Sequence, residues 1–366
     1  HAHDFDHWAA LGNPGWDYRS VLPWFRHSQR QQRGADAWHG DQGSMDVVDT
    51  NQRFPVSEAF VQACGEAGQK VSDDFNGAEQ EGCGFYQVTQ TPGGRRANSA
   101  YAFLDEALAR PNLIVMTGVH VTRIRFSGKT ATGVEIARHG PRGPREVLAA
   151  RQEVILSAGV INSPQLLKLS GIGPAAELQS HGIAVVHDLP GVGENLQDHP
   201  DVIIRCRDKS GTSMAVAPTR SSLAFFARMF TQADFVYTPT DCGGFVRSQA
   251  GEAIPDLQLQ FAAVRMQPHG RGLFTAMRAG FVLHICHLRP QSRGRVTLCS
   301  ADPFAAPVIH AGYFTKEKEL DALVRGVRLG REILAQPAMK AFHGGEESPG
   351  PQVRSDDDLR RWVREH

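Results

Sequence analysis

The stretch from residue 151 to residue 200 constrains the fold of this chain more than any other. Its first part predicts a strand over residues 153–156, followed by a turn of small residues. A helix follows, opened by Asn162 and Ser163 with Pro164 in its first turn, where a missing backbone amide removes no helical hydrogen bond. A strand that meets a helix at such a turn is where open α/β sheets bind ligands.

The second part of the stretch predicts a helix followed by a strand, the opposite order from the first part. Gly171 ends the first helix, Pro174 opens a second helix and Gly182 ends it, before an apolar strand over residues 183–186. The result is a strand-helix-helix-strand unit. Its pattern alone fits a structural crossover as well as a ligand-binding turn.

The totals exclude several classes of protein. The chain has 366 residues with 41% hydrophobic content, which is enough for two domains with buried cores. Lys plus Arg equals Asp plus Glu at 39 each, so no net charge favours nucleic acid or an anionic membrane surface. The chain has no run of eighteen apolar residues, so the sequence predicts no transmembrane segment. Six cysteines without a CxxC pair favour a reducing compartment.

Two further regions predict antiparallel strands. Residues 112–136 read as two strands about a Gly128-Lys129 turn. Residues 255–264, 279–288 and 294–300 alternate apolar and polar side chains with period two. We therefore expect a mixed fold of α/β and α+β character, whose antiparallel sheet has one packed face and one face that lines a pocket.

Several sequence motifs of the chain then indicate a family. SAGVINSPQLLKLSGIG followed by PGVGENLQDH, together with DFDHWAALGNPGW at residues 4–16, resembles the glucose-methanol-choline (GMC) family of FAD-dependent oxidoreductases. The segments are similar to those of choline-dehydrogenase-like alcohol dehydrogenases. The resemblance implies part of a Rossmann-like FAD-binding domain plus a substrate domain, with helices flanking an antiparallel sheet.

The resemblance also implies a division of the chain. Five segments are expected: 1–36 covering the flavin, 37–111 as the first part of the substrate domain, 112–200 as a remnant of the FAD-binding domain, 201–314 as the sheet of the substrate domain, and 315–366 as C-terminal helices.

Five residues are implied as FAD contacts by the resemblance: Val121, Ala158, Gly159, Arg96 and Asn195. Val121 matches, in register, the position whose backbone lies beside the adenine ring, although a valine in a strand is ordinarily a core residue. Arg96 precedes a helix start, where basic side chains and free amides can bind an anion. A solvated turn explains Arg96 equally well.

Asp241 is the candidate substrate-binding residue. It occupies the place of an acid that faces the substrate in choline-oxidising relatives. A carboxylate can hold a cationic or hydroxylated substrate by charge-assisted hydrogen bonds. The alternative is a solvated loop aspartate, and the shorter side chain makes a preference for choline uncertain.

Two family motifs do not occur in residues 1–366. The first is G-x-G-x-x-G, which binds the pyrophosphate of FAD, and the second is H-P-x-G-T, whose His is the general base. His366 matches a helix residue that precedes this base, so we predict no catalytic residue. The parent enzyme is expected to oxidise a primary alcohol to an aldehyde with the flavin accepting hydride. The isolated chain is expected to be inactive, and its binding of FAD is doubtful.

Several alternatives stay open. The family includes oxidases and a cyanohydrin lyase, and a non-catalytic fragment or binding module is a second class. An NAD-linked dehydrogenase is disfavoured because no complete dinucleotide turn is present. We expect a small-molecule alcohol as the partner, no nucleic acid, and no metal, since His1, His3 and His7 form no closed site. Self-association through apolar surface and a cytoplasmic location, with peripheral attachment to the inner face of the membrane as the alternative, are also expected.

Overall fold

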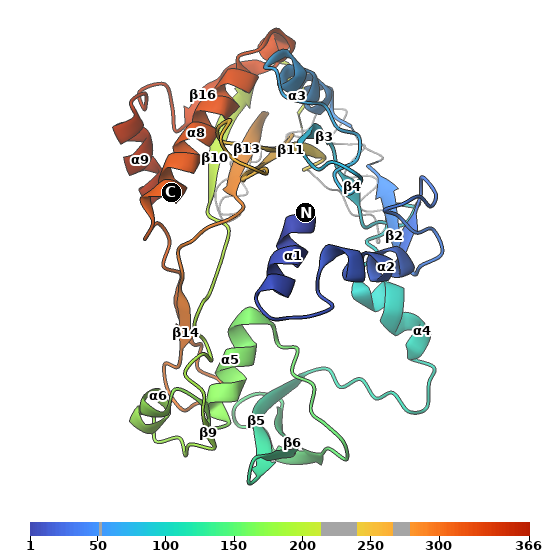
Figure 1. Cartoon of the computed structure of the whole chain (residues 1–366), viewed down its shortest axis with the longest axis vertical. Coiled ribbons are helices and arrows are strands. Elements are labelled where there is room, and N and C mark those ends of the chain that lie inside the picture. The colour runs from blue at the N-terminus through green and yellow to red at the C-terminus, as the bar shows by residue number, and fades with distance from the viewer. Residues whose placement is uncertain (51–52, 214–239, 266–278) are drawn as a thin grey trace. The chain divides into compact units, whose positions relative to one another are not determined.

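The computed structural model describes residues 1–50, 53–213, 240–265 and 279–366 (Figure 1). They divide into two compact units. Unit 1 comprises residues 1–110, 199–289 and 318–366, and unit 2 comprises residues 111–198 and 290–317. The predicted mixed α and β fold is confirmed.

Unit 1 is built on a six-stranded sheet in which every neighbouring pair is antiparallel. The strand order is β16-β10-β13-β12-β11-β3. The strands are β3 (Gly82–Phe85), β10 (Asp201–Asp208), β11 (Cys242–Val246), β12 (Leu257–Ala262), β13 (Gly280–His287) and β16 (His343–Ser348). The prediction from the period-two pattern is confirmed for residues 255–264 and 279–288, which supply β12 and β13 of this sheet. Residues 294–300 were expected in the same sheet, but their strand pairs with residues 308–310 outside it.

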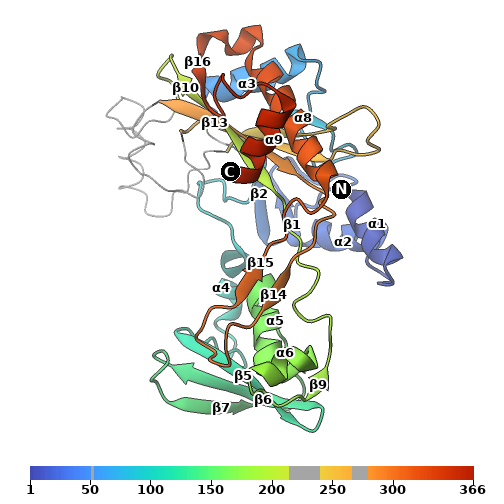
Figure 2. The same ribbon diagram turned by 90° about the vertical axis from the view of Figure 1, so that its left-hand side faces the viewer.

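One face of this sheet carries the core of unit 1. Helix α8 (Glu317–Leu334) lies on it so closely that a Cβ on Gly326 would be 2.5 Å from Cγ2 of Ile285. Helix α3 (Pro55–Glu66) packs beside it, with Phe60 stacked on Phe261 at 4.5 Å between ring centroids. Figure 2 shows α8 beside β13 and β10. Burial of these apolar side chains is what holds the helices to the sheet.

The other face of the sheet carries polar side chains beside a small apolar cluster of Ala262, Val282 and Ile203. Gln258 and Gln260 of β12 and His284 of β13 are half-buried there, between fully buried neighbours. This alternation follows from the pleat, which turns successive side chains to opposite faces. The expectation that this face lines a pocket stays a prediction.

Unit 1 also contains a second, smaller sheet. Strands β1 (Gln29–Gln31), β2 (Met45–Asp49) and β4 (Gln87–Val88) form a three-stranded sheet. The other helices among the described residues of unit 1 are α1 (Ala2–Ala10), α2 (Tyr18–Ser28), a π-helix (Ala100–Leu104), α4 (Asp105–Ala107), a 3-10 helix (Pro337–Ala341) and α9 (Asp356–Glu365).

Unit 2 contains the stretch that opened the sequence analysis. Its helices are α5 (Gly159–Leu169) and α6 (Ala175–Ser180), and β5 (Val119–Ser127), β6 (Thr130–Arg138) and β7 (Arg145–Ala149) form a sheet. The short pairs are β8 (Ile172–Gly173) with β9 (His187–Asp188), and β14 (Arg295–Thr297) with β15 (Val308–His310). The predicted turn between β5 and β6 is confirmed, with Gly128 at φ +58°.

Both predicted strands of the central stretch are wrong. Residues 153–156 have no strand partner within the described ranges, and residues 183–186 lead only to the two-residue strand β9. An apolar run specifies burial, but a strand also needs a neighbour for its backbone groups. The predicted helix ends are confirmed, since Gly171 and Gly182 have φ of +88° and +68°. The predicted helix start is late, because α5 begins at Gly159.

A buried cation ties the parts of unit 2 together. Lys168 of α5 is fully buried, and its Nζ donates to Glu177 Oε2 at 2.8 Å and to the Val296 carbonyl at 2.7 Å. The other oxygen of Glu177 accepts from the Leu298 amide at 2.7 Å. Residues 290–314, which the sequence assigned to the substrate domain, therefore pack with unit 2 in this structure.

Unit 2 also exposes large apolar side chains. The exposed fractions of Ile114, Ile155 and Val160 are 82%, 79% and 66%. Such surface favours association, so we expect the chain to self-associate as its concentration rises. Ile155→Lys should lower the apparent mass in sizing chromatography with light scattering. Leu11→Lys, a control at a 67% exposed site in unit 1, should leave it unchanged. A monomer at every concentration would contradict this expectation.

Among the described residues, no helix is both long and apolar enough to cross a lipid bilayer.

Candidate functional site

The N-terminus of helix α5 is an open backbone surface. Gly159 has φ +81° and nothing within 4 Å of the position of a Cβ. No side chain caps the helix and no acid lies in its first turn. The Ala158 amide donates to Ser163 Oγ at 3.1 Å, and the first-turn amides after it have no partner within the helix. Such a helix end can bind an anionic or hydrogen-bond-accepting group.

The other implied FAD contacts lie in both units. Val121 is in β5 of unit 2 and is 38% exposed, beside an irregularity in the β5–β6 register. Asn195 is also in unit 2 and has the left-handed φ of +62°. Arg96 is exposed in unit 1 and bridges Gln90 by backbone pairing. Unit 2 thus holds four of the five.

These unit 2 residues fit part of a flavin nucleotide. The uncapped amides of α5 suit its oxygen and nitrogen acceptors, and the missing Cβ at Gly159 permits close approach of a ligand to the backbone. The exposed Val121, Ile155 and Val160 suit its apolar ring edges. Contact between this wall of unit 2 and FAD stays a prediction.

Asp241 directly precedes β11 and is fully buried. Its Oδ1 accepts from Ser57 Oγ at 2.8 Å, and its Oδ2 has no hydrogen-bond partner among the described residues. Burial raises the pKa of this carboxyl to about 6. The hydrogen bond from Ser57 acts in the opposite direction and lowers the pKa by less. The solvated loop aspartate considered from the sequence is therefore wrong. The substrate contact stays a prediction.

A His–carboxylate pair lies on the face of the large sheet that carries Gln258 and Gln260. His284 Nδ1 is 2.6 Å from Asp201 Oδ2, and the two residues are on neighbouring strands, opposite Ile203 and Cys286 respectively. The sequence pattern did not indicate this pairing of His284. Its actual partner is 83 residues away in sequence and could be found only from the strand pairing.

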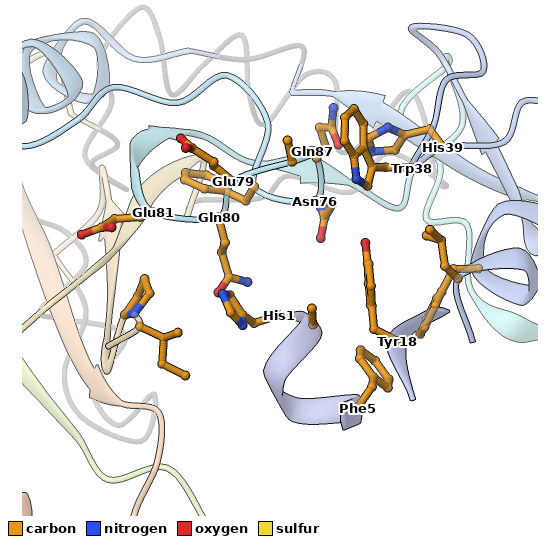
Figure 3. A pocket seen from close by; sticks show the side chains of 18 of the residues that line it. His1, Phe5, Tyr18, Trp38, His39, Asn76, Glu79, Gln80, Glu81 and Gln87 are labelled. Carbon is orange, nitrogen blue, oxygen red and sulfur yellow. The ribbon is translucent and has the colours of Figure 1, made fainter. Parts of the chain in front are cut away.

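Unit 1 contains a cavity of about 750 Å³ that the sequence did not indicate (Figure 3). Helices α1 and α2, strands β2 and β4, and the loop before β3 contribute its walls. Phe5, Tyr18, Trp38 and Phe75 line it together with amide side chains such as Gln87. Figure 3 shows Tyr18 and Asn76 directed into the space. A cavity of this size can hold a small organic ligand.

His39 is the most buried polar residue of this cavity. It is 3% exposed, and its Nδ1 lies 3.0 Å from Asp36 Oδ1. The same oxygen accepts the backbone amides of Trp38 and His39, each at 2.7 Å. Nε2 has no hydrogen-bond partner among the described residues. In the sequence, His39 belongs to the segment AWHGDQGSMDV. This segment predicts only a turn that leads into a strand, which is a common pattern.

Comparison with known proteins decides the family. Two profiles described as GMC oxidoreductase match residues 1–201 and residues 290–366. The chain belongs to the GMC oxidoreductase family. Members of this family bind FAD. The resemblance stated from the central stretch is therefore confirmed.

Curated GMC relatives align over the whole chain. An alcohol dehydrogenase [acceptor] of Pseudomonas putida is 40% identical over 369 residues, which are all of this chain and 66% of that protein. An oxygen-dependent choline dehydrogenase of Brucella ovis is 40% identical over 372 residues, with the same two shares. The chain thus spans 66% of the length of these relatives.

Solved structures agree on the GMC fold. A formate oxidase is 25% identical with a TM-score of 0.86, and the match covers 100% of this chain and 69% of that one. A pyridoxine 4-oxidase from Mesorbium loti has a TM-score of 0.83 at 22% identity, over 99% of this chain and 67% of that one. The latter likeness concerns the fold alone.

Proposed function

We propose that this chain is part of an FAD-dependent oxidoreductase of the GMC family, which oxidises a primary alcohol to an aldehyde. The observation that carries the proposal is the open N-terminus of α5, where Gly159 lies in the stretch that matches the family. Two relatives at 40% identity are named for alcohol and choline dehydrogenation. Because the chain spans 66% of the length of these relatives, we propose this activity for the whole protein.

Each residue has a proposed part. FAD, when bound, accepts the hydride from the alcohol carbon. The amides at Ala158 and Gly159 would hold an acceptor group of the cofactor, and the β5 backbone at Val121 would lie beside its adenine. Asn195 and Arg96 would contact other polar groups, and Asp241 would orient the substrate hydroxyl. None of these residues is proposed as the base.

A paired glycine experiment tests the cofactor part. Gly159→Ala places a methyl group in the proposed path of FAD, whereas Gly182→Ala adds the same group at a φ of +68° after α6. Both glycines have positive φ and empty space at the Cβ position, so the backbone strain is matched. We expect weak FAD binding by the unmodified chain, a loss of at least about tenfold for Gly159→Ala, and little change for Gly182→Ala.

The measurement is the fluorescence of FAD titrated with protein, followed by an absorption spectrum after desalting. Flavin bands that survive desalting would show that the wall suffices without the glycine-rich phosphate motif. Equal affinities for the two alanine variants, or no FAD binding by the unmodified chain, would contradict the proposed contact at Gly159.

A further inference from the structure

Strand β16 lies at the edge of the large sheet, beside β10 (Figure 2), and contains a β-bulge. Consecutive residues Arg205 and Cys206 of β10 are opposite β16 residues that are two apart, which leaves Glu347 between them as the extra residue. Its neighbour Glu346 pairs with Arg331 of α8 at 2.7 Å, on the face that carries the core. Glu347 pairs with arginines of the opposite face. Bulges of this kind re-aim side chains and are common beside functional sites.

Two guanidinium groups share the carboxylate of Glu347. Arg265 Nε and Nη2 donate to its two oxygens at 2.8 Å and 2.7 Å, and Arg205 Nε lies 3.4 Å from Oε2. Gly280 of β13 leaves room for this arrangement, because a Cβ there would lie 2.9 Å from both Cβ and Cδ of Arg265. One negative charge therefore faces two positive charges, since a guanidinium stays protonated in proteins.

The Glu347 contact leaves most of the binding capacity of Arg205 unused. The distance from Arg205 Nε to Glu347 makes an ion pair, but this nitrogen has no hydrogen-bond partner among the described residues. A guanidinium carries five N–H donors. The side chain of Arg205 is 20% exposed and that of Arg265 is 12% exposed, so neither is sealed in the core. A small anion can therefore reach the outer nitrogens of Arg205.

The surroundings of Arg205 also favour an anion. Arg207, two residues along β10 on the same face, is exposed and forms no ion pair with a described residue. Asp201 lies at the other end of this strand and is paired with His284. Val282 lies directly opposite Arg205 and belongs to a buried apolar cluster. Apolar neighbours strengthen the attraction between opposite charges, because they replace water, which screens it.

We infer that Arg205 binds the carboxylate group of a small-molecule ligand, with Arg207 and Arg265 supplying further positive charge. A planar carboxylate matches the planar fork of a guanidinium, and Glu347 is held by Arg265 in this two-bonded way. The ligand would balance the positive charge that Glu347 leaves unpaired. The inference goes beyond the proposed function, because neither FAD nor the oxidation of an alcohol is part of it.

The test titrates the chain with benzoate at pH 7.5 and low ionic strength, by calorimetry or ligand-observed NMR. Benzamide has nearly the same shape without the charge, and inorganic phosphate is a tetrahedral anion. We expect benzoate to bind at least about tenfold more tightly than benzamide, and more tightly than phosphate, since only benzoate offers a charged planar group. Salt at about 0.5 M should weaken benzoate binding, because it screens exposed charges.

Two variants with opposite expected effects test the site. Arg205→Gln removes the charged partner of the ligand, so benzoate should lose at least about tenfold in affinity while benzamide is unchanged. Glu347→Gln keeps the shape of the side chain and removes the competing carboxylate, so benzoate should gain about threefold or more. Arg125→Gln, at an exposed position of β5 in unit 2, is the matched control for Arg205→Gln and should leave benzoate binding unchanged.

The inference is overturned if benzoate does not bind, if benzamide binds equally well, or if Arg205→Gln leaves the affinity for benzoate unchanged. Phosphate that binds more tightly than benzoate would overturn the assignment to a carboxylate. Thermal unfolding of each variant checks that the fold is retained. If Arg205→Gln does not fold, Glu347→Gln decides, because damage to the fold does not produce a gain in affinity for benzoate.

Discussion

Lys168→Met should destabilise unit 2 by about 3–5 kcal/mol, because the change removes one partner of a buried ion pair. Glu177 would then lose its charged partner, and the Val296 carbonyl would lose a donor. Chemical denaturation followed by circular dichroism measures the free energy of unfolding. A change smaller than about 1 kcal/mol would show that the buried pair contributes little.

Two controls accompany this measurement. Lys129→Met changes the same residue type in the exposed turn between β5 and β6 and should cost no more than about 0.5 kcal/mol. The double variant Lys168→Met with Glu177→Leu removes both charges and should be less destabilised than Lys168→Met alone. A double variant as unstable as the sum of its parts would indicate a packing defect instead.

Asp241→Asn should make the chain more stable at pH 7 by up to about 3 kcal/mol and should remove a pH dependence. Burial raises the pKa of Asp241 to about 6 in the folded state, from a reference value of 3.8. The folded state therefore binds more protons than the unfolded state between these values. The stability from protonated Asp241 is fully present below about 3.8 and is lost as the pH rises through about 6.

The free energy of unfolding is measured at pH 4.5, 6 and 7.5 for both proteins. Asparagine keeps an oxygen for the hydroxyl of Ser57, so the local contact persists. The gain of the variant should grow with pH. Asp73→Asn, at an exposed site, should show no such growth. A difference between Asp241→Asn and the original chain that is constant across this range would contradict the buried charge.

The elements that follow from local chemistry were predictable. The glycines at 171 and 182 end their helices because they adopt positive φ, and the alternating strands of the large sheet were found from their period of two. The family was evident from the central stretch. The strands at 153–156 and 183–186 were not predictable in this way, since a strand exists only where another strand pairs with it.

The sequence by itself determined the family, the mixed fold and the open turn at Gly159. All three rest on local patterns: long motifs for the family, period-two alternation for the strands, and a run of small residues for the turn. The tertiary structure alone decided that Asp241 is buried against Ser57, that Lys168 joins Glu177 to the Val296 carbonyl, and which side chains share the cavity of His39 and Gln87. Whether a polar atom is satisfied, charged or free for a ligand depends on partners far away in sequence. Only folding brings those partners within hydrogen-bonding distance.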